Sequence, residues 1–84
     1  MMTVLEEALD HLVRGIVDHP DDVRVRQVSG RGPRRTGGKT LQIRVHPEDL
    51  GKVIGRGGRT ATALRTVMSG IGGRNVRVDV IDTP

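Results

Sequence analysis

The chain has 84 residues, with 14 Lys and Arg against 10 Asp and Glu, and it contains no cysteine and no Phe, Tyr or Trp. This length fits a single domain over residues 1–84, and the lack of cysteine excludes disulfides and Cys-based zinc sites. The lack of aromatic rings argues against folds that stack bases on such rings, namely the RRM, the OB-fold and the cold-shock domain.

The net charge of +4 is distributed unevenly along the chain. Residues 1–22 hold six acids and one arginine, whereas residues 23–84 hold thirteen Lys and Arg and four acids. A basic region on a small fold is typical of polyanion binders, although a merely solvated basic surface has the same composition. No apolar run has the length of a membrane-spanning helix, so a cytoplasmic protein without a membrane partner is expected.

Residues 3–18 predict an amphipathic helix, because apolar side chains recur there at helical spacing. Thr3 and Glu6 have the spacing of a capping box at its start. His19 precedes Pro20 and is expected to end the helix, since a residue before proline is disfavoured in the helical region.

Two strands are predicted next, at residues 23–28 and 41–45, where apolar and polar residues alternate. The segment 29–38 between them is rich in Gly and Arg and has no core face, so it predicts a flexible loop. Its arginines are expected either to reach a nucleic-acid backbone or to stay solvated; they are Arg31, Arg34 and Arg35.

Pro47 suits the first position of a short helix that ends at Ile54, with Glu48 and Asp49 near the positive end of its dipole. A further helix starts near residue 58 or 59 and ends at the glycines of residues 70–73, and the last strand is expected at 76–80. The order α-β-β-α-α-β predicts an α+β fold of two layers, with three helices on one face of a three-stranded sheet. The other face is expected to carry Arg24, Arg26, Gln42, Arg44, Arg77 and Asp79.

The turn Gly55-Arg56-Gly57-Gly58 between the two later helices is the candidate binding site. Such a turn brings backbone amides and a helix N-terminus to one exposed point, which favours an anion such as phosphate. Glycine allows a phosphate to approach the backbone without a Cβ in the way. The flanking cations are Lys52, Arg56 and Arg59.

Two nucleotide-binding loops are excluded by their spacing. A Walker A loop that ends at Lys39-Thr40 would need a glycine at position 33, which is Pro33. A dinucleotide-binding pattern that starts at Gly55 would need a glycine at position 60, which is Thr60, and would follow a strand, whereas a helix is predicted here.

The segment Val53-Ile-Gly-Arg-Gly-Gly58, followed by a helix that carries Leu64, resembles the V-I-G-x-x-G signature of KH domains. The element order resembles that of the type II KH fold. Residues 12–25 and 47–55 are similar to the opening helix and central motif of the small bacterial single-KH proteins of the KhpA family. Thr60 and Ala61 stand where bulkier aliphatic residues are common in that family, which implies a shallower groove.

The resemblance implies that the turn clamps the backbone of about four nucleotides of single-stranded RNA, with the bases in an adjoining groove. Ile54 and Leu64 are then expected in the apolar wall of the groove, and Arg44 with the segment 29–38 in the opposite rim. The RNA-binding residues implied are Gly55, Arg56, Gly57, Gly58, Lys52, Arg59, Ile54 and Arg44.

The resemblance further implies a post-transcriptional regulator or RNA chaperone of low sequence selectivity. It implies a homodimer, or a heterodimer with a larger KH-containing protein of the KhpB or Jag type. The alternatives are a protein-interaction adaptor, favoured by the acidic first helix, and a binder of single-stranded DNA. His11, His19 and His46 lack metal-ligand spacing and no nucleophile has a recognisable base, so the sequence predicts no metal site, no cofactor and no enzyme.

Overall fold

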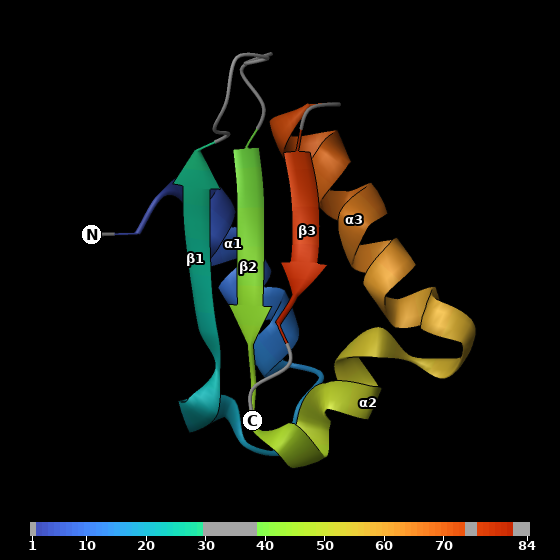
Figure 1. Cartoon of the computed structure of the whole chain (residues 1–84). Helices are drawn as coiled ribbons and strands as arrows, with labels where there is room; N and C mark the ends of the chain where they lie inside the picture. Colours follow the sequence, from blue (N-terminus) through green and yellow to red (C-terminus); the bar gives the residue numbers. More distant parts are fainter. Residues whose placement is uncertain (1, 30–38, 74–75, 82–84) are drawn as a thin grey trace.

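The computed structural model describes residues 2–29, 39–73 and 76–81, and these form two layers (Figure 1). One layer is a three-stranded sheet, and helices α1 (Val4–Arg14) and α3 (Arg59–Gly72) pack on one face of it. The short helix α2 (Leu50–Ile54) lies at one end of these layers, where it leads into α3. The predicted α+β class and the order α-β-β-α-α-β are confirmed.

The sheet contains β1 (Arg24–Ser29), β2 (Lys39–Arg44) and β3 (Val76–Val80), in the spatial order β1-β2-β3. Strands β1 and β2 are antiparallel, whereas β2 and β3 are parallel. The parallel pair requires a crossover connection, and the chain supplies it as α2 followed by α3. The three strands were predicted from their alternating patterns, β3 with the bounds that the structure has.

Aliphatic side chains from both layers form the core. Leu9 and Val13 on α1 meet Leu41 and Ile43 on β2, and Met68 on α3 is likewise fully buried. The alternate residues of the strands point to the uncovered face of the sheet, as predicted. Its arginines are exposed there: Arg24, Arg26, Arg44 and Arg77.

Helix α1 ends at Arg14, four residues before the predicted end. Gly15 is its C-cap, and Asp49 holds the following segment out of the helix. The Asp49 carboxylate accepts hydrogen bonds from the backbone N–H groups of Asp18, at 3.2 Å, and His19, at 2.9 Å. His19 therefore lies in the connection to β1 and not on the helix surface, where the sequence had placed it.

The second half of the chain differs from the prediction at the start of α2 and agrees with it at the end of α3. Residues Pro47–Asp49 form a 3₁₀ turn capped by His46, and the α-helical part begins only at Leu50. Helix α3 continues through Gly70 to Gly72 and stops at Gly73, whose φ of +95° is incompatible with a right-handed helix. The helix therefore ends among the glycines of residues 70–73, as predicted, although Gly70 itself is still helical.

Glu6 joins the start of α1 to strand β1. One carboxylate oxygen accepts the backbone N–H of Thr3 at 2.7 Å, and the other accepts the backbone N–H of Gln27 at 2.7 Å. These two hydrogen bonds lower the pKa of the Glu6 carboxyl. The predicted capping box is present, and it also satisfies an N–H group on the open edge of the sheet.

We expect Glu6→Gln to lower the melting temperature at pH 7 by about 4 to 8 °C, the shift that about 1 kcal/mol produces in a domain of this size. The folded-state pKa of Glu6 lies below its ordinary value of 4.5. Its contribution is therefore present above pH 4.5 and is lost as the pH falls through the folded-state pKa. Thermal unfolding at pH 7 and pH 3 should show a difference from the unmodified protein that shrinks at pH 3.

Glu7→Gln is the matched control, because Glu7 is an exposed neighbour in the same helical turn. It removes the same charge without breaking the contact to β1. An equal fall in melting temperature for both variants would contradict the role assigned to Glu6.

Candidate nucleic-acid interface

The glycine turn connects α2 to α3 and has an unusual backbone. Gly55, Gly57 and Gly58 have φ values of +78°, +63° and +77°. A 3₁₀ turn spans Arg56–Gly58, in which the N–H of Gly58 donates to the carbonyl oxygen of Gly55 at 3.0 Å. Three of the four positions thus need a conformation that glycine adopts without steric cost.

The three glycines have different surroundings. A Cβ on Gly55 would lie 2.7 Å from the backbone nitrogen of Thr60 and closer still to its Oγ1. A Cβ on Gly57 or Gly58 would meet nothing within 4 Å. Gly55 is therefore needed to close the turn against α3, whereas Gly57 and Gly58 leave the backbone open to an approaching ligand.

The cations near the turn fall into two groups. Arg56 and Arg59 are exposed, and in the described part of the chain no ion pair involves either of them. The Lys52 ammonium group pairs instead with the Asp18 carboxylate, and this hydrogen bond raises the pKa of Lys52. The structure thus places Lys52 one helical turn before the glycines but ties it to the segment after α1.

An open groove of about 500 Å³ adjoins the turn. Ile54, whose side chain is partly exposed, and Gly58 lie on its turn side, whereas Leu64 is buried and belongs to the core. The remaining lining comes from α3 and from the end of the sheet at β3: Ala61, Arg65, Arg77, Asp79, Val80 and Ile81.

Two polar contacts order the far wall of this groove. Arg65 Nε donates to the carbonyl oxygen of Val78 at 3.2 Å, and Arg77 Nε donates to Asp79 Oδ1 at 3.1 Å. The sequence reasoning assigned Arg77 and Asp79 to the uncovered face of the sheet and did not connect them with the turn. Only the fold brings the last strand beside the start of α3.

Arg44 does not line this groove. It lies opposite Arg24 on the uncovered face of the sheet, in a shallow depression shared with Arg26 and Gln42. Lys39 begins β2 and Arg44 ends it, and most of segment 29–38, the other part of the expected rim, lies outside the described residues. Arg31, Arg34 and Arg35 lie outside the described residues.

Asp49 lies at the start of α2 and links it to the segment after α1. The sequence did not indicate this role. Its side chain is 1% exposed, and it accepts His19 Nδ1 at 3.0 Å besides the backbone N–H groups of Asp18 and His19. Burial raises the pKa of this carboxyl, but the hydrogen bonds from His19 and the backbone outweigh burial and leave the pKa lowered. Those partners are about thirty residues away in sequence, and no local pattern signals such a contact.

Residues 6–81 match the family model described as KhpA/KhpB, KH domain. The chain is 63% identical over 83 residues to the RNA-binding protein KhpA of Mycobacterium tuberculosis, covering 99% of this chain and 98% of the relative. It is 67% identical over 79 residues to the RNA-binding protein KhpA of Streptomyces coelicolor, covering 94% of each. No helix in the described part of the chain is both long and apolar enough to cross a membrane.

We expect Gly55→Ala and Gly57→Ala to differ in stability although they lie two residues apart. The Gly57→Ala substitution should lower the free energy of unfolding by about 1 to 2 kcal/mol, because alanine is strained in the left-handed conformation. At Gly55, a collision with Thr60 adds to an equally unfavourable φ, so the expected loss is about 3 kcal/mol or more. Denaturant unfolding measures both, and equal losses would contradict the division of roles within the turn.

Proposed function

Because the chain belongs to the KhpA/KhpB family of KH domains, we propose that it binds single-stranded RNA with the turn Gly55-Arg56-Gly57-Gly58 as a backbone clamp. One observation carries this proposal. Gly57 and Gly58 offer an open left-handed backbone beside two exposed arginines, Arg56 and Arg59, at the mouth of a groove. The relatives described above both carry the name RNA-binding protein KhpA.

The start of α3 supplies the attraction for a phosphate. No side chain caps the N-terminus of this 14-residue helix. The N–H groups of Gly58 and Arg59 donate to the carbonyl oxygens of Gly55 and Arg56, so the helix offers a ligand chiefly the positive end of its dipole. Arg56 and Arg59 add charge at the same point. A phosphate at the turn would therefore meet the helix dipole and two cations.

The adjoining groove then receives the bases. Ile54, Ala61, Val80 and Ile81 give it an aliphatic surface, on which bases of any identity can lie. Arg77 Nε already donates to Asp79 Oδ1, which occupies part of the polar surface that could read base edges. Low sequence selectivity follows, and a clamp on the backbone discriminates poorly between RNA and single-stranded DNA.

A site for so few nucleotides binds weakly on its own, and pairing of two such domains raises affinity through effective concentration. We propose that the protein acts in the cytoplasm as a post-transcriptional regulator or RNA chaperone, paired with itself or with a larger KhpB- or Jag-type chain. Val67 and Ile71, one turn apart on α3, are 44% and 52% exposed and support such pairing. The same exposed residues also suit the alternative function, a protein-interaction adaptor for which RNA binding is incidental. In that case a pull-down should still capture the protein partner after nuclease treatment.

We expect the double substitution Arg56→Asp with Gly57→Asp to reduce binding of a mixed-sequence RNA at least tenfold. Two carboxylates would then face the phosphate, while the exposed turn keeps its place in the fold. Filter binding or fluorescence anisotropy measures the affinity, and far-UV circular dichroism checks that the helices remain.

The control is Met2→Asp with Val4→Asp, which adds two carboxylates to exposed positions at the start of α1, away from the turn. This variant should bind RNA with nearly unchanged affinity. A folded turn variant that binds as tightly as this control would refute the clamp.

We expect the logarithm of the RNA affinity to fall with the logarithm of the salt concentration with a slope of roughly −1.4 to −2.1, which corresponds to two or three phosphates on a single strand. Arg59→Gln should make the slope shallower by about 0.7. Lys52→Gln should change it less, because Lys52 already has a carboxylate partner in Asp18. A slope near zero would favour the adaptor, and an equal effect of both substitutions would show that Lys52 leaves Asp18 for the RNA.

A further inference from the structure

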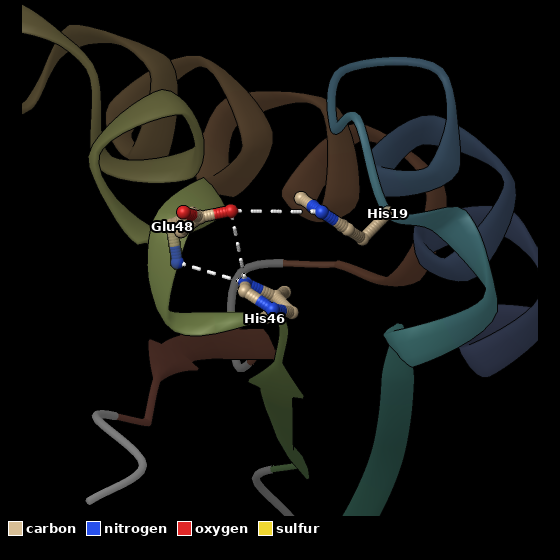
Figure 2. A group of neighbouring side chains, drawn as sticks. All are labelled: His19, His46 and Glu48. Carbon is tan, nitrogen blue, oxygen red and sulfur yellow. Dashed lines mark hydrogen bonds and ion pairs between the residues drawn. The ribbon is translucent and has the colours of Figure 1, made fainter.

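Three side chains of types that can bind a metal ion lie close together at the N-terminal end of α2. The glycine turn lies at the other end of that helix. Figure 2 shows that His19 comes from the connection between α1 and β1, whereas His46 and Glu48 come from the turn that precedes α2. Glu48 Oε1 lies 3.6 Å from His19 Nε2 and 3.9 Å from His46 Nδ1. The two imidazole rings are stacked with their centroids 4.0 Å apart.

The orientation of His19 is set by a buried carboxylate. Asp49 Oδ2 lies 3.0 Å from His19 Nδ1, and the same carboxylate accepts the backbone N–H of His19. An imidazole that donates from Nδ1 to a carboxylate presents the lone pair of Nε2 on its other side. In neutral His19 this lone pair faces the Glu48 carboxylate, and either a proton or a metal cation between the two atoms would satisfy both.

We propose that His19, His46 and Glu48 bind a divalent transition-metal ion, with Zn²⁺ as the first choice, and that Asp49 is the positioning residue for His19. Two imidazoles and one carboxylate are a ligand set that suits zinc, with water in the fourth position. A carboxylate behind a metal-bound histidine is the common means of fixing the ring and raising its basicity. Mg²⁺ and Ca²⁺ prefer oxygen ligands and do not suit a site with two imidazoles.

The distances are near those of a metal site, but one ring has to turn, because the stacked imidazoles now direct their in-plane lone pairs alongside each other and not at one point. The candidate ligand atoms lie within 4.8 Å of one another. Metal–ligand bonds of about 2.0 to 2.1 Å bring tetrahedral ligands to roughly 3.4 Å apart, so the two contacts of Glu48 need to shorten by about half an ångström or less. Glu48 is 75% exposed and free to adjust.

One existing contact has to change. His46 Nδ1 now accepts the backbone N–H of Glu48 at 3.0 Å, which caps the turn. Metal binding through Nδ1 replaces that hydrogen bond, and a rotation of the ring that presents Nε2 has the same consequence. The ion would join the segment after α1 to the segment before α2, and it would leave the glycine turn and the groove accessible.

The test is a titration of the tag-free 84-residue chain with Zn²⁺ in a non-chelating buffer, monitored by isothermal titration calorimetry. We expect one ion per chain. His19→Asn, Glu48→Gln and His46→Asn should each weaken binding at least tenfold. Asparagine at position 46 is chosen because it is a good N-cap and keeps the turn.

His11→Asn is the matched control, since His11 is the remaining histidine of the chain and lies exposed on α1. It should bind Zn²⁺ as the unmodified protein does. The proposal is overturned if the unmodified protein does not bind Zn²⁺, if the three site variants bind as tightly as the control, or if His11→Asn itself loses binding.

The positioning role of Asp49 needs a separate readout. Nitrogen-15 NMR spectra of the metal-free protein near pH 8 should show His19 with its proton on Nδ1, and Asp49→Asn should change that tautomer. The same variant should weaken Zn²⁺ binding by about ten- to a hundredfold. An unchanged tautomer together with unchanged affinity would remove Asp49 from the proposal while leaving the three ligands to their own test.

Discussion

The placement of the glycine turn depends on the buried carboxylate of Asp49. This one side chain holds the backbone of Asp18 and His19 and the ring of His19, and it sits directly before α2. A buried charge is tolerated only when its hydrogen-bonding capacity is met, and here three donors meet it. Helix α2 has only five residues and packs on the core through Val53 and Leu50, and the hydrogen bonds of Asp49 add a polar link from its start to the segment after α1. The segment after α1 therefore acts as the anchor for the helix that leads into the turn.

The same contacts determine which positive charges remain near the glycine turn. Lys52 on α2 pairs with Asp18, so the same anchor also takes one positive charge away from the turn. Asp10 similarly engages Arg14 within α1. In the described part of the chain, the acidic residues that form these pairs belong to the first quarter of the sequence. The uneven charge of the sequence is thus partly neutralised by the fold, and Arg56 and Arg59 remain as the cations beside the open backbone of Gly57 and Gly58.

Much of the fold could be predicted because its signals are local. Alternation of apolar and polar residues gave the strands, including β3 with its bounds, and the same alternation placed Arg24 and Arg26 on the uncovered face. The spacing of the glycines gave the turn. The end of α1 was predicted wrongly because it depends on Asp49, which lies about thirty residues away. The pairing of Lys52 with Asp18 and the stacking of His19 on His46 have the same long-range origin.

This limit applies most directly to the two histidines. Their separation of 27 residues matches no metal-binding motif, which is why the sequence predicted no site. Spacing rules describe ligands carried by one helix or one loop, and they do not cover ligands that two loops bring together. The contact that brings these loops together is the Asp49 anchor, since it fixes the segment of His19 against the turn that carries His46. The residue that positions the proposed RNA-binding turn at one end of α2 is therefore also the residue that brings the two histidines together at the other end.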